Sequence, residues 1–219
     1  MNNLNLIQET VIWILPVLLA IIVHEVAHGW VANLLGDSTA LMLGRLTLNP
    51  LKHIDFIGTI VIPLICVFTG GIIFGWAKPV PINSRHFKHF RTDNALVAIA
   101  GPISNLLMAI IWATIIKITI LFFPPIMPQS SKLFVTHMGY AGITVNVFLM
   151  ILNLVPIPPL DGSKVAESVL PPEIANIYEV ITPYGFIILL ILMYTNTLTT
   201  IIEPPFSWIQ QAIFNCFTI

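Results

Sequence analysis

Three side chains near the N-terminus have the types and spacing of a metal-dependent hydrolase. They are His24, Glu25 and His28, in the pattern His-Glu-Val-Ala-His. On a helix, residues four apart lie on one face about one turn apart, so both imidazoles can reach one metal ion. The glutamate can take a proton from a water that the metal activates. The alternative is a polar trio that is hydrogen-bonded inside a helix bundle, and the pattern favours the metal site.

The composition indicates that this motif lies in a membrane protein. Of the 219 residues, 57% are apolar and 9% are charged, and the mean hydropathy is +0.92. A soluble domain of this size cannot hide so much apolar side chain, because its surface is too large a share of its volume. The formal net charge of -1 excludes a nucleic-acid partner bound through a basic surface.

Five apolar stretches each have about the 20 residues that a bilayer core requires. They lie at roughly 10–35, 54–76, 95–121, 135–155 and 183–202. No Lys or Arg precedes Arg45, so we interpret the first stretch as a retained transmembrane helix rather than a signal peptide. The fold expected is an all-α polytopic membrane protein with four to five transmembrane helices, in a single domain over residues 1–219.

The basic residues distinguish between two topologies. If all five stretches span and the N-terminus is cytoplasmic, Lys78, Arg85, Lys88, Arg91 and Lys164 lie inside, against Arg45, Lys52 and Lys132 outside. If 54–76 instead re-enters and the N-terminus is outside, only Lys132 of these remains outside. The second topology fits the positive-inside rule better and gives the motif and Asp161 the same depth, nearer the cytoplasm. Pro63 and Gly70-Gly71 could bend such a segment, and a kinked spanning helix is the alternative.

Two further segments could form a small β element at the cytoplasmic face. Polar and apolar residues alternate from Arg45 to Asn49 within 41–49, which is strand periodicity. The segment 75–83 contains Pro79 and Pro81 and should be extended. Either segment could hold a substrate by strand addition. A plain interfacial loop is the alternative.

A catalytic zinc usually has three protein ligands and one open position, so one ligand must come from elsewhere in the chain. The strongest candidate is Asp161, in Asn153-Leu-Val-Pro-Ile-Pro-Pro-Leu-Asp161-Gly162. The prolines end a helix, and Gly162 frees the backbone after the aspartate. An unpaired carboxylate in the bilayer costs about 3 kcal/mol, which a metal ion would offset. The alternative is an interfacial aspartate that faces water.

These blocks together resemble the site-2 protease family of intramembrane zinc metalloproteases, in its small bacterial branch without a PDZ or other accessory domain. The matching blocks are HEVAHGW, GRLTLNPLKHID, FGWAKPVPIN, AGPISN and NLVPIPPLDG. The resemblance implies one Zn²⁺ held by His24, His28 and Asp161, with Glu25 as general base. It also implies a membrane-spanning protein substrate, cut within the lipid bilayer of the cell membrane, the bacterial inner membrane.

Two asparagines are candidates for binding substrate backbone or supporting an oxyanion. Asn105 follows the Gly101-Pro102 pair by one turn, and the resemblance places such an asparagine near the active site. A helix–helix hydrogen bond is an equal alternative for it. Asn153 lies near the end of the fourth stretch. For the whole chain, the alternative functions are a membrane metal-ion transporter and an inactive relative that binds membrane helices without cutting them.

Overall fold

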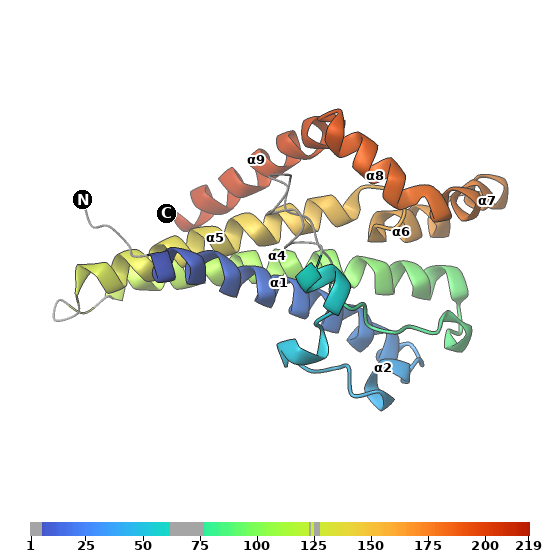
Figure 1. Cartoon of the computed structure of the whole chain (residues 1–219), viewed down its shortest axis with the longest axis horizontal. Helices are drawn as coiled ribbons and strands as arrows, with labels where there is room; N and C mark the ends of the chain where they lie inside the picture. The colour runs from blue at the N-terminus through green and yellow to red at the C-terminus, as the bar shows by residue number, and fades with distance from the viewer. Residues whose placement is uncertain (1–5, 62–76, 123, 125–127) are drawn as a thin grey trace.

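The computed structural model describes residues 6–61, 77–122, 124 and 128–219 (Figure 1). The described part of the chain is helical and contains no strand. Its longer helices are α1 (Leu6–Leu34), α4 (Phe90–Phe122), α5 (Gln129–Leu154) and α9 (Thr197–Phe217). The shorter α-helices are α2 (Thr39–Met42), α6 (Asp161–Val169), α7 (Pro172–Ile181) and α8 (Gly185–Tyr194). Short 3₁₀ or π turns lie at Pro50–Lys52, Phe56–Val61, Ser84–His86 and Thr182–Tyr184.

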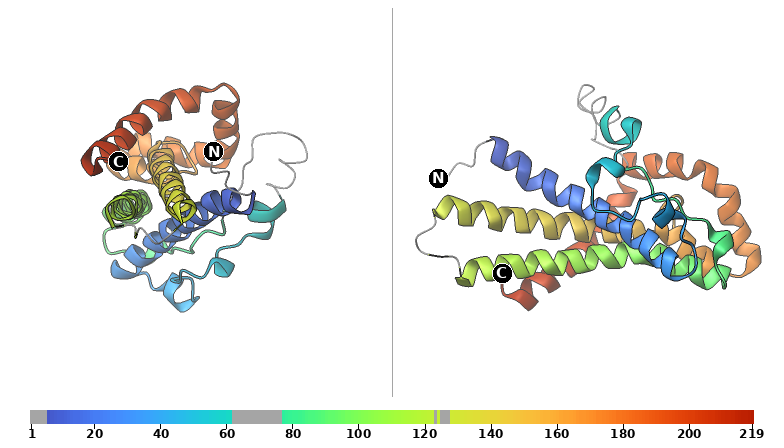
Figure 2. Two further views of the ribbon diagram at one scale, coloured as in Figure 1. Left: turned by 90° about the vertical axis from the view of Figure 1, so that its left-hand side faces the viewer. Right: turned by 90° about the horizontal axis from the view of Figure 1, so that it is seen from below.

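Helices α1, α4 and α5 pack side by side along the long axis of the molecule (Figures 1 and 2). α1 and α5 run in one direction and α4 runs in the other. Small residues allow the close approach, as is usual between membrane helices. A Cβ added at Gly142 of α5 would lie 2.4 Å from the ring of Trp112 on α4. Around this contact, Ile116, Ile143 and Val147 form the buried apolar core.

The described residues include four helical segments that are long and apolar enough to cross a membrane. They are Ile7–Leu34, Phe90–Phe122, Gln129–Leu154 and Glu173–Tyr194. Large apolar side chains face outward along them, such as Trp13, which is 53% exposed, and Ile111, which is 50% exposed. The prediction of an all-α, multi-pass membrane protein is thus confirmed, with four segments of sufficient length and hydropathy in the described chain.

The last predicted stretch, 183–202, is not one helix. α8 ends at Tyr194 and α9 begins at Thr197, because Asn196 takes a left-handed conformation with φ 57°. α8 and α9 therefore meet at an angle, and α9 packs back along α5 (Figure 1). α9 ends at the same end of the bundle at which α1 begins.

The predicted β element is wrong for the residues that the structure describes. Residues 41–49 contain the end of α2, a turn and bends, and 77–83 is extended without a partner strand. The extended form of 77–83 follows from Pro79 and Pro81, but its backbone is bound by side chains and loops rather than by a strand. Most of the predicted re-entrant stretch 54–76 lies outside the described residues, since 62–76 is not among them.

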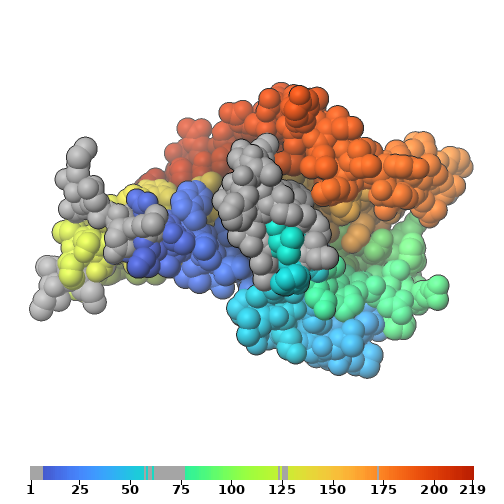
Figure 3. All heavy atoms as spheres, viewed as in Figure 1, coloured from blue at the N-terminus to red at the C-terminus, as the bar shows by residue number. Residues whose placement is uncertain are grey.

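The described parts of the connection between α1 and α4 lie along the half of the bundle in which α1 ends and α4 begins (Figure 1). α1 ends and α4 begins there, so residues 35–89 leave and return at the same end (Figure 1). In the space-filling view, the residues from about 35 to 61 and from 77 to 90 form a lobe against that end of the molecule (Figure 3). This lobe lies beside the part of α1 that carries the His-Glu-Val-Ala-His motif.

Candidate metal centre

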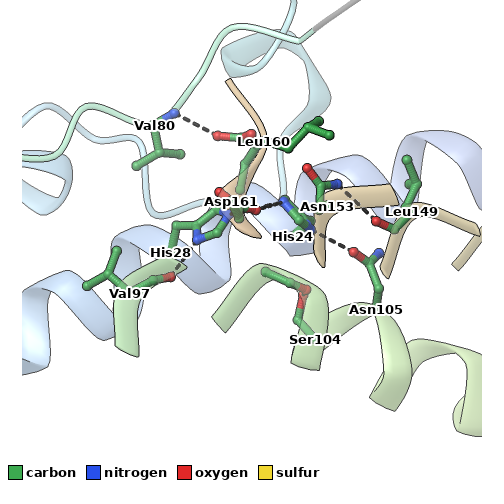
Figure 4. Close-up of polar contacts among 12 residues, drawn as sticks. His24, His28, Val80, Val97, Ser104, Asn105, Leu149, Asn153, Leu160 and Asp161 are labelled. Atoms are coloured by element: carbon green, nitrogen blue, oxygen red, sulfur yellow. Dashed lines mark hydrogen bonds and ion pairs between the residues drawn. The ribbon is translucent and has the colours of Figure 1, made fainter. Parts of the chain in front are cut away.

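Three predicted ligands meet in one buried cluster, although 137 residues separate the first from the last (Figure 4). His24 and His28 are 7% and 6% exposed on α1, and Asp161, at 7%, begins α6. The Nε2 atoms of the two histidines are 3.0 Å apart. Each Nε2 is also 3.1 Å from Oδ2 of Asp161. The three atoms form a nearly equilateral triangle.

Contacts with α4 orient both imidazoles. Nδ1 of His24 lies 2.6 Å from Oδ1 of Asn105, and Nδ1 of His28 lies 2.7 Å from the carbonyl oxygen of Val97. The carbonyl can only accept, so Nδ1 of His28 donates, and the amide oxygen sets the same tautomer for His24. Each Nε2 then turns its lone pair toward the cluster. Metal-binding histidines are commonly held in this way by a partner on the other ring nitrogen.

The triangle fits a zinc ion by its donor set and its dimensions. Two imidazole nitrogens and a carboxylate oxygen are common ligands of catalytic zinc. Bonds of about 2.0–2.1 Å in a tetrahedron place ligand atoms roughly 3.3 Å apart, close to the 3.0 and 3.1 Å found here. Three lone-pair atoms this close repel one another unless a proton or a cation lies among them. The donor set and its dimensions therefore suit one small cation.

The turn before α6 brings Asp161 to the histidines. α5 ends at Leu154, and the proline-rich segment after it cannot continue the helix. Gly162 permits the tight return, since a Cβ there would lie 2.4 Å from the Leu154 carbonyl oxygen and 2.5 Å from that of Val155. The turn thus places Oδ2 of Asp161 3.1 Å from the Nε2 atom of each histidine.

Helix α4 approaches the cluster more closely than any residue with a side chain would allow. A Cβ added at Gly101 would lie 2.4 Å from Nε2 of His28 and 2.6 Å from Nε2 of His24. Pro102 follows, and the Ser104 hydroxyl donates to the carbonyl oxygen of Gly101 over 2.7 Å. In the sequence, the Gly101-Pro102 pair served only to locate Asn105, and nothing in it predicted this contact with the ligands.

Glu25 lies beside the cluster on the same helix and is half-buried. Its Oε2 accepts a hydrogen bond of 2.8 Å from the backbone N–H of Val80 (Figure 4). No sequence pattern predicted this contact, because Val80 is 55 residues away in an apolar, proline-rich segment. The bond fixes one carboxylate oxygen of Glu25 and leaves the other without that restraint.

The two predicted asparagines lie in different settings. The Asn105 amide nitrogen donates to Oδ1 of Asn146 over 3.0 Å and to the Ala20 carbonyl over 3.3 Å. With its oxygen on His24, this fully buried carboxamide is bound to protein at both ends. Asn153 is half-buried near the end of α5, and its amide nitrogen donates to the Leu149 carbonyl over 3.0 Å (Figure 4).

A second polar cluster, outside the metal centre, joins the two described parts of the lobe, residues 35–61 and 77–90. Fully buried Asp37 accepts the backbone N–H of Asn83 at 2.6 Å and Nδ1 of His86 at 2.9 Å. It also binds the backbone N–H and the hydroxyl of Thr39. Burial raises the pKa of Asp37, but these hydrogen bonds outweigh it and lower the pKa to about 2. No sequence pattern singled out Asp37 or His86.

Comparison with known proteins decides the family. A sequence model of peptidase family M50 matches residues 118–192. "Putative zinc metalloprotease YwhC" of Bacillus subtilis is 35% identical over 205 residues, which cover 94% of this chain and 90% of that protein. The chain belongs to peptidase family M50. "Putative zinc metalloprotease Rip2" of Mycolicibacterium smegmatis is 30% identical over 181 residues, covering 83% of this chain and 66% of that protein. No solved structure matches the chain.

Family membership confirms three predictions from the sequence: the resemblance to site-2 proteases, the enzyme class and the cofactor. The protein is a zinc metalloprotease with transmembrane helices. In the described part of the chain, His24, His28 and Asp161 are the group of potential metal ligands whose atoms lie within 4.8 Å of one another.

Proposed function

We propose that this metalloprotease hydrolyses peptide bonds of membrane-spanning protein substrates within the bilayer. In this proposal, His24, His28 and Asp161 hold the zinc ion and Glu25 is the general base. The observation that supports it most is the triangle of three lone-pair atoms, 3.0–3.1 Å apart, on side chains buried within a bundle of membrane-spanning length. Ionisable groups inside a membrane are costly, and they usually mark a functional site.

The chemistry follows from the positions of the side chains. Zinc supplies Lewis acidity toward the attacking water and the scissile carbonyl. Glu25 takes the proton of the water as it attacks and later delivers it to the leaving amine. Val80 N–H holds one oxygen of Glu25, so the carboxylate meets the water in one orientation. We assign Asn105 to orienting His24, because its carboxamide is bound at both ends. Asn153 stays our candidate for contacting the substrate backbone.

We place the site nearer the cytoplasmic side of the cell membrane, the bacterial inner membrane, with the N-terminus outside. The antiparallel course of α1 and α4 supports this topology, since residues 35–89 then begin and end on one side. Five basic residues of that connection, at positions 45, 52, 78, 85 and 88, lie on the same side, as does Arg91 in the first turn of α4. Such an excess of Lys and Arg is typical of cytoplasmic segments. We treat residues 1–219 as one proteolytic domain.

Two experiments on purified protein test the proposal. The zinc content of the detergent-purified chain should be about one per molecule and should fall sharply in Asp161→Ala, while Glu173→Ala, at an exposed site, keeps its zinc. Equal zinc in Asp161→Ala would remove this carboxylate from the site. In liposomes, the wild type should cut a labelled transmembrane helix, and Glu25→Gln should bind zinc but lose roughly 10²–10⁴-fold in rate.

The same liposomes distinguish the alternative functions. A metal-ion transporter would carry zinc across the vesicle membrane and would retain this flux in Glu25→Gln. An inactive relative would bind the labelled helix without cutting it. Zinc-dependent cleavage that requires Glu25, with no flux, is the outcome expected here, because the motif places a carboxylate beside the ligands.

A further inference from the structure

The extended segment 77–83 passes directly over the catalytic motif. Val80 is buried, and its side chain sits on Gly29, where an added Cβ would lie 2.7 Å from Val80 Cγ1. The absence of a side chain at Gly29 lets the segment come close enough for the Val80 N–H to reach Glu25. Pro79 and Pro81 have no N–H, so Val80 supplies the sole backbone donor of the three residues 79–81. That N–H donates its hydrogen bond to the Glu25 carboxylate.

The segment is anchored just before Val80 by two groups from the lobe. The backbone N–H of Lys78 donates to the carbonyl oxygen of His53 over 2.9 Å. Nη2 of Arg45 donates to the carbonyl oxygens of Lys78 and Pro79, over 2.8 and 3.3 Å. Both backbone groups of Lys78 are therefore bound, and the Pro79 carbonyl is bound as well. The geometry at Val80 depends on these anchors.

Arg45 is an unusual residue for a purely structural position. Its side chain is buried, with the residue 8% exposed, and among the described residues no carboxylate lies within ion-pair distance of it. Burying a guanidinium without a carboxylate costs several kcal/mol unless its hydrogen bonds repay that cost. An apolar side chain would pack in this space without the cost. The planar guanidinium, in contrast, can reach two adjacent carbonyl oxygens from one side.

We propose that Arg45 is a positioning residue that acts on Glu25 through the segment 77–80. It holds the Lys78 and Pro79 carbonyls, which fixes the direction of the Val80 N–H and thereby the Glu25 carboxylate. The inference rests on Glu25 as general base. Positioning matters because a displacement of about 1 Å in a reacting group can cost about 10²-fold in rate. The bound backbone groups also mean that 78–80 serves Glu25 rather than pairing with a substrate strand.

Hydrogen–deuterium exchange on the full chain with zinc bound tests the anchor without any substrate. Because Pro79 and Pro81 have no amide hydrogen, a peptide covering 77–83 reports on few amides, Lys78 and Val80 among them. In Arg45→Met these two amides should exchange about tenfold faster than in the wild type, with zinc content unchanged. Arg45→Lys should recover part of the protection. Arg85→Met, which removes an exposed arginine of the same lobe, should change nothing.

Unchanged protection at Lys78 and Val80 in zinc-loaded Arg45→Met would overturn the proposal. So would exchange that rises throughout the chain together with loss of zinc, since that result indicates a general structural role. If Arg45→Met does not fold, Arg45→Lys decides by the same measurement: it should loosen the 77–83 peptide and no other part of the chain.

Cleavage of the labelled helix adds a second readout. Arg45→Met and Val80→Pro, which removes the N–H that binds Glu25, should each lower kcat by about 10–100-fold with KM within about twofold. The double variant should be no slower than the slower single variant, because both changes act on one contact. Additive losses would contradict a common path through Val80. A wild type that cuts nothing would count against the proposed function, while the exchange result would still decide the role of Arg45 as an anchor.

Discussion

Replacing Gly101 with alanine should disable zinc binding with the addition of a single methyl group. The new Cβ would lie 2.4 Å from Nε2 of His28, 2.5 Å from Cε1 of His24 and 2.6 Å from its Nε2. An optimal contact is about 3.5 Å, so each overlap is roughly 1 Å. Neither ring can turn away freely, because each Nδ1 is bound to α4 itself, at Asn105 and at Val97.

The overlap can be relieved in two ways, and both damage the site. If α4 moves outward, the variant bears an overpacking cost of about 1–3 kcal/mol, and the partners of both Nδ1 atoms move with the helix. If the rings rotate, the Nε2 lone pairs leave the triangle. Losing the orienting partners alone typically lowers metal affinity 10–100-fold. Gly101→Ala should lose at least that much, because the methyl group also occupies the space beside the ligand atoms.

The assay is zinc content after purification, followed by the rate of zinc loss to a chelator. Gly139→Ala is the matched control, since its Cβ would lie 2.3 Å from Ile116 Cγ1, away from the ligands. The control should lower the unfolding temperature and keep about one zinc per chain, whereas Gly101→Ala should be substoichiometric. Full zinc and unchanged chelator resistance in Gly101→Ala would refute the close approach of α4 to the ligands.

Three further predictions concern orientation, pH and the metal. Asn105→Leu removes the partner of His24 and should lower zinc affinity about 10–100-fold in a chelator competition, whereas an affinity equal to the wild type would argue against orientation by this amide. The folded pKa of Asp37 is lowered to about 2, so its contribution to stability is present above its unfolded value of 3.8 and is lost as pH falls through 2. Asp37→Asn should therefore unfold at a lower temperature than the wild type at pH 7, and the gap should close between pH 4 and 2. Removing zinc should lower the unfolding temperature of the wild type and leave that of Asp161→Ala nearly unchanged, as measured by scanning calorimetry.

The three proposed metal ligands could be chosen from the sequence, because their spacing and the cost of placing such residues in a membrane both favoured them. His24 and His28 share a helix face by their spacing alone, and Asp161 follows a proline-rich end that has to turn. Each is also an ionisable residue, which is costly inside a membrane and therefore usually marks a functional site. The presence of several long apolar helices followed from hydropathy, which is a property of whole segments.

The partners of those ligands could not be found, because they depend on how distant helices pack. Val97 contributes a backbone carbonyl, which no residue type reveals, and Gly101 contributes the absence of a side chain. The prediction of paired strands failed for a related reason. The alternation from Arg45 to Asn49 is real, but the buried Arg45 side chain binds the backbone of 78–79, so a side chain replaces the expected strand pairing.

A chain of hydrogen bonds across three helices explains how the bundle can hold polar groups in its interior. It runs from His24 through Asn105 to Asn146 and ends at the carbonyl oxygen of Gly142, joining α1, α4 and α5. Each of these groups would be costly in hydrocarbon if it were unpaired, so a slip of one helix along another breaks several bonds at once. The same chain of hydrogen bonds fixes the orientation of the His24 ring. The contacts that set the register of the three helices are thus also those that aim a ligand at the metal site, which leaves α6 and the segment 77–80 to supply the carboxylate of Asp161 and the orientation of Glu25.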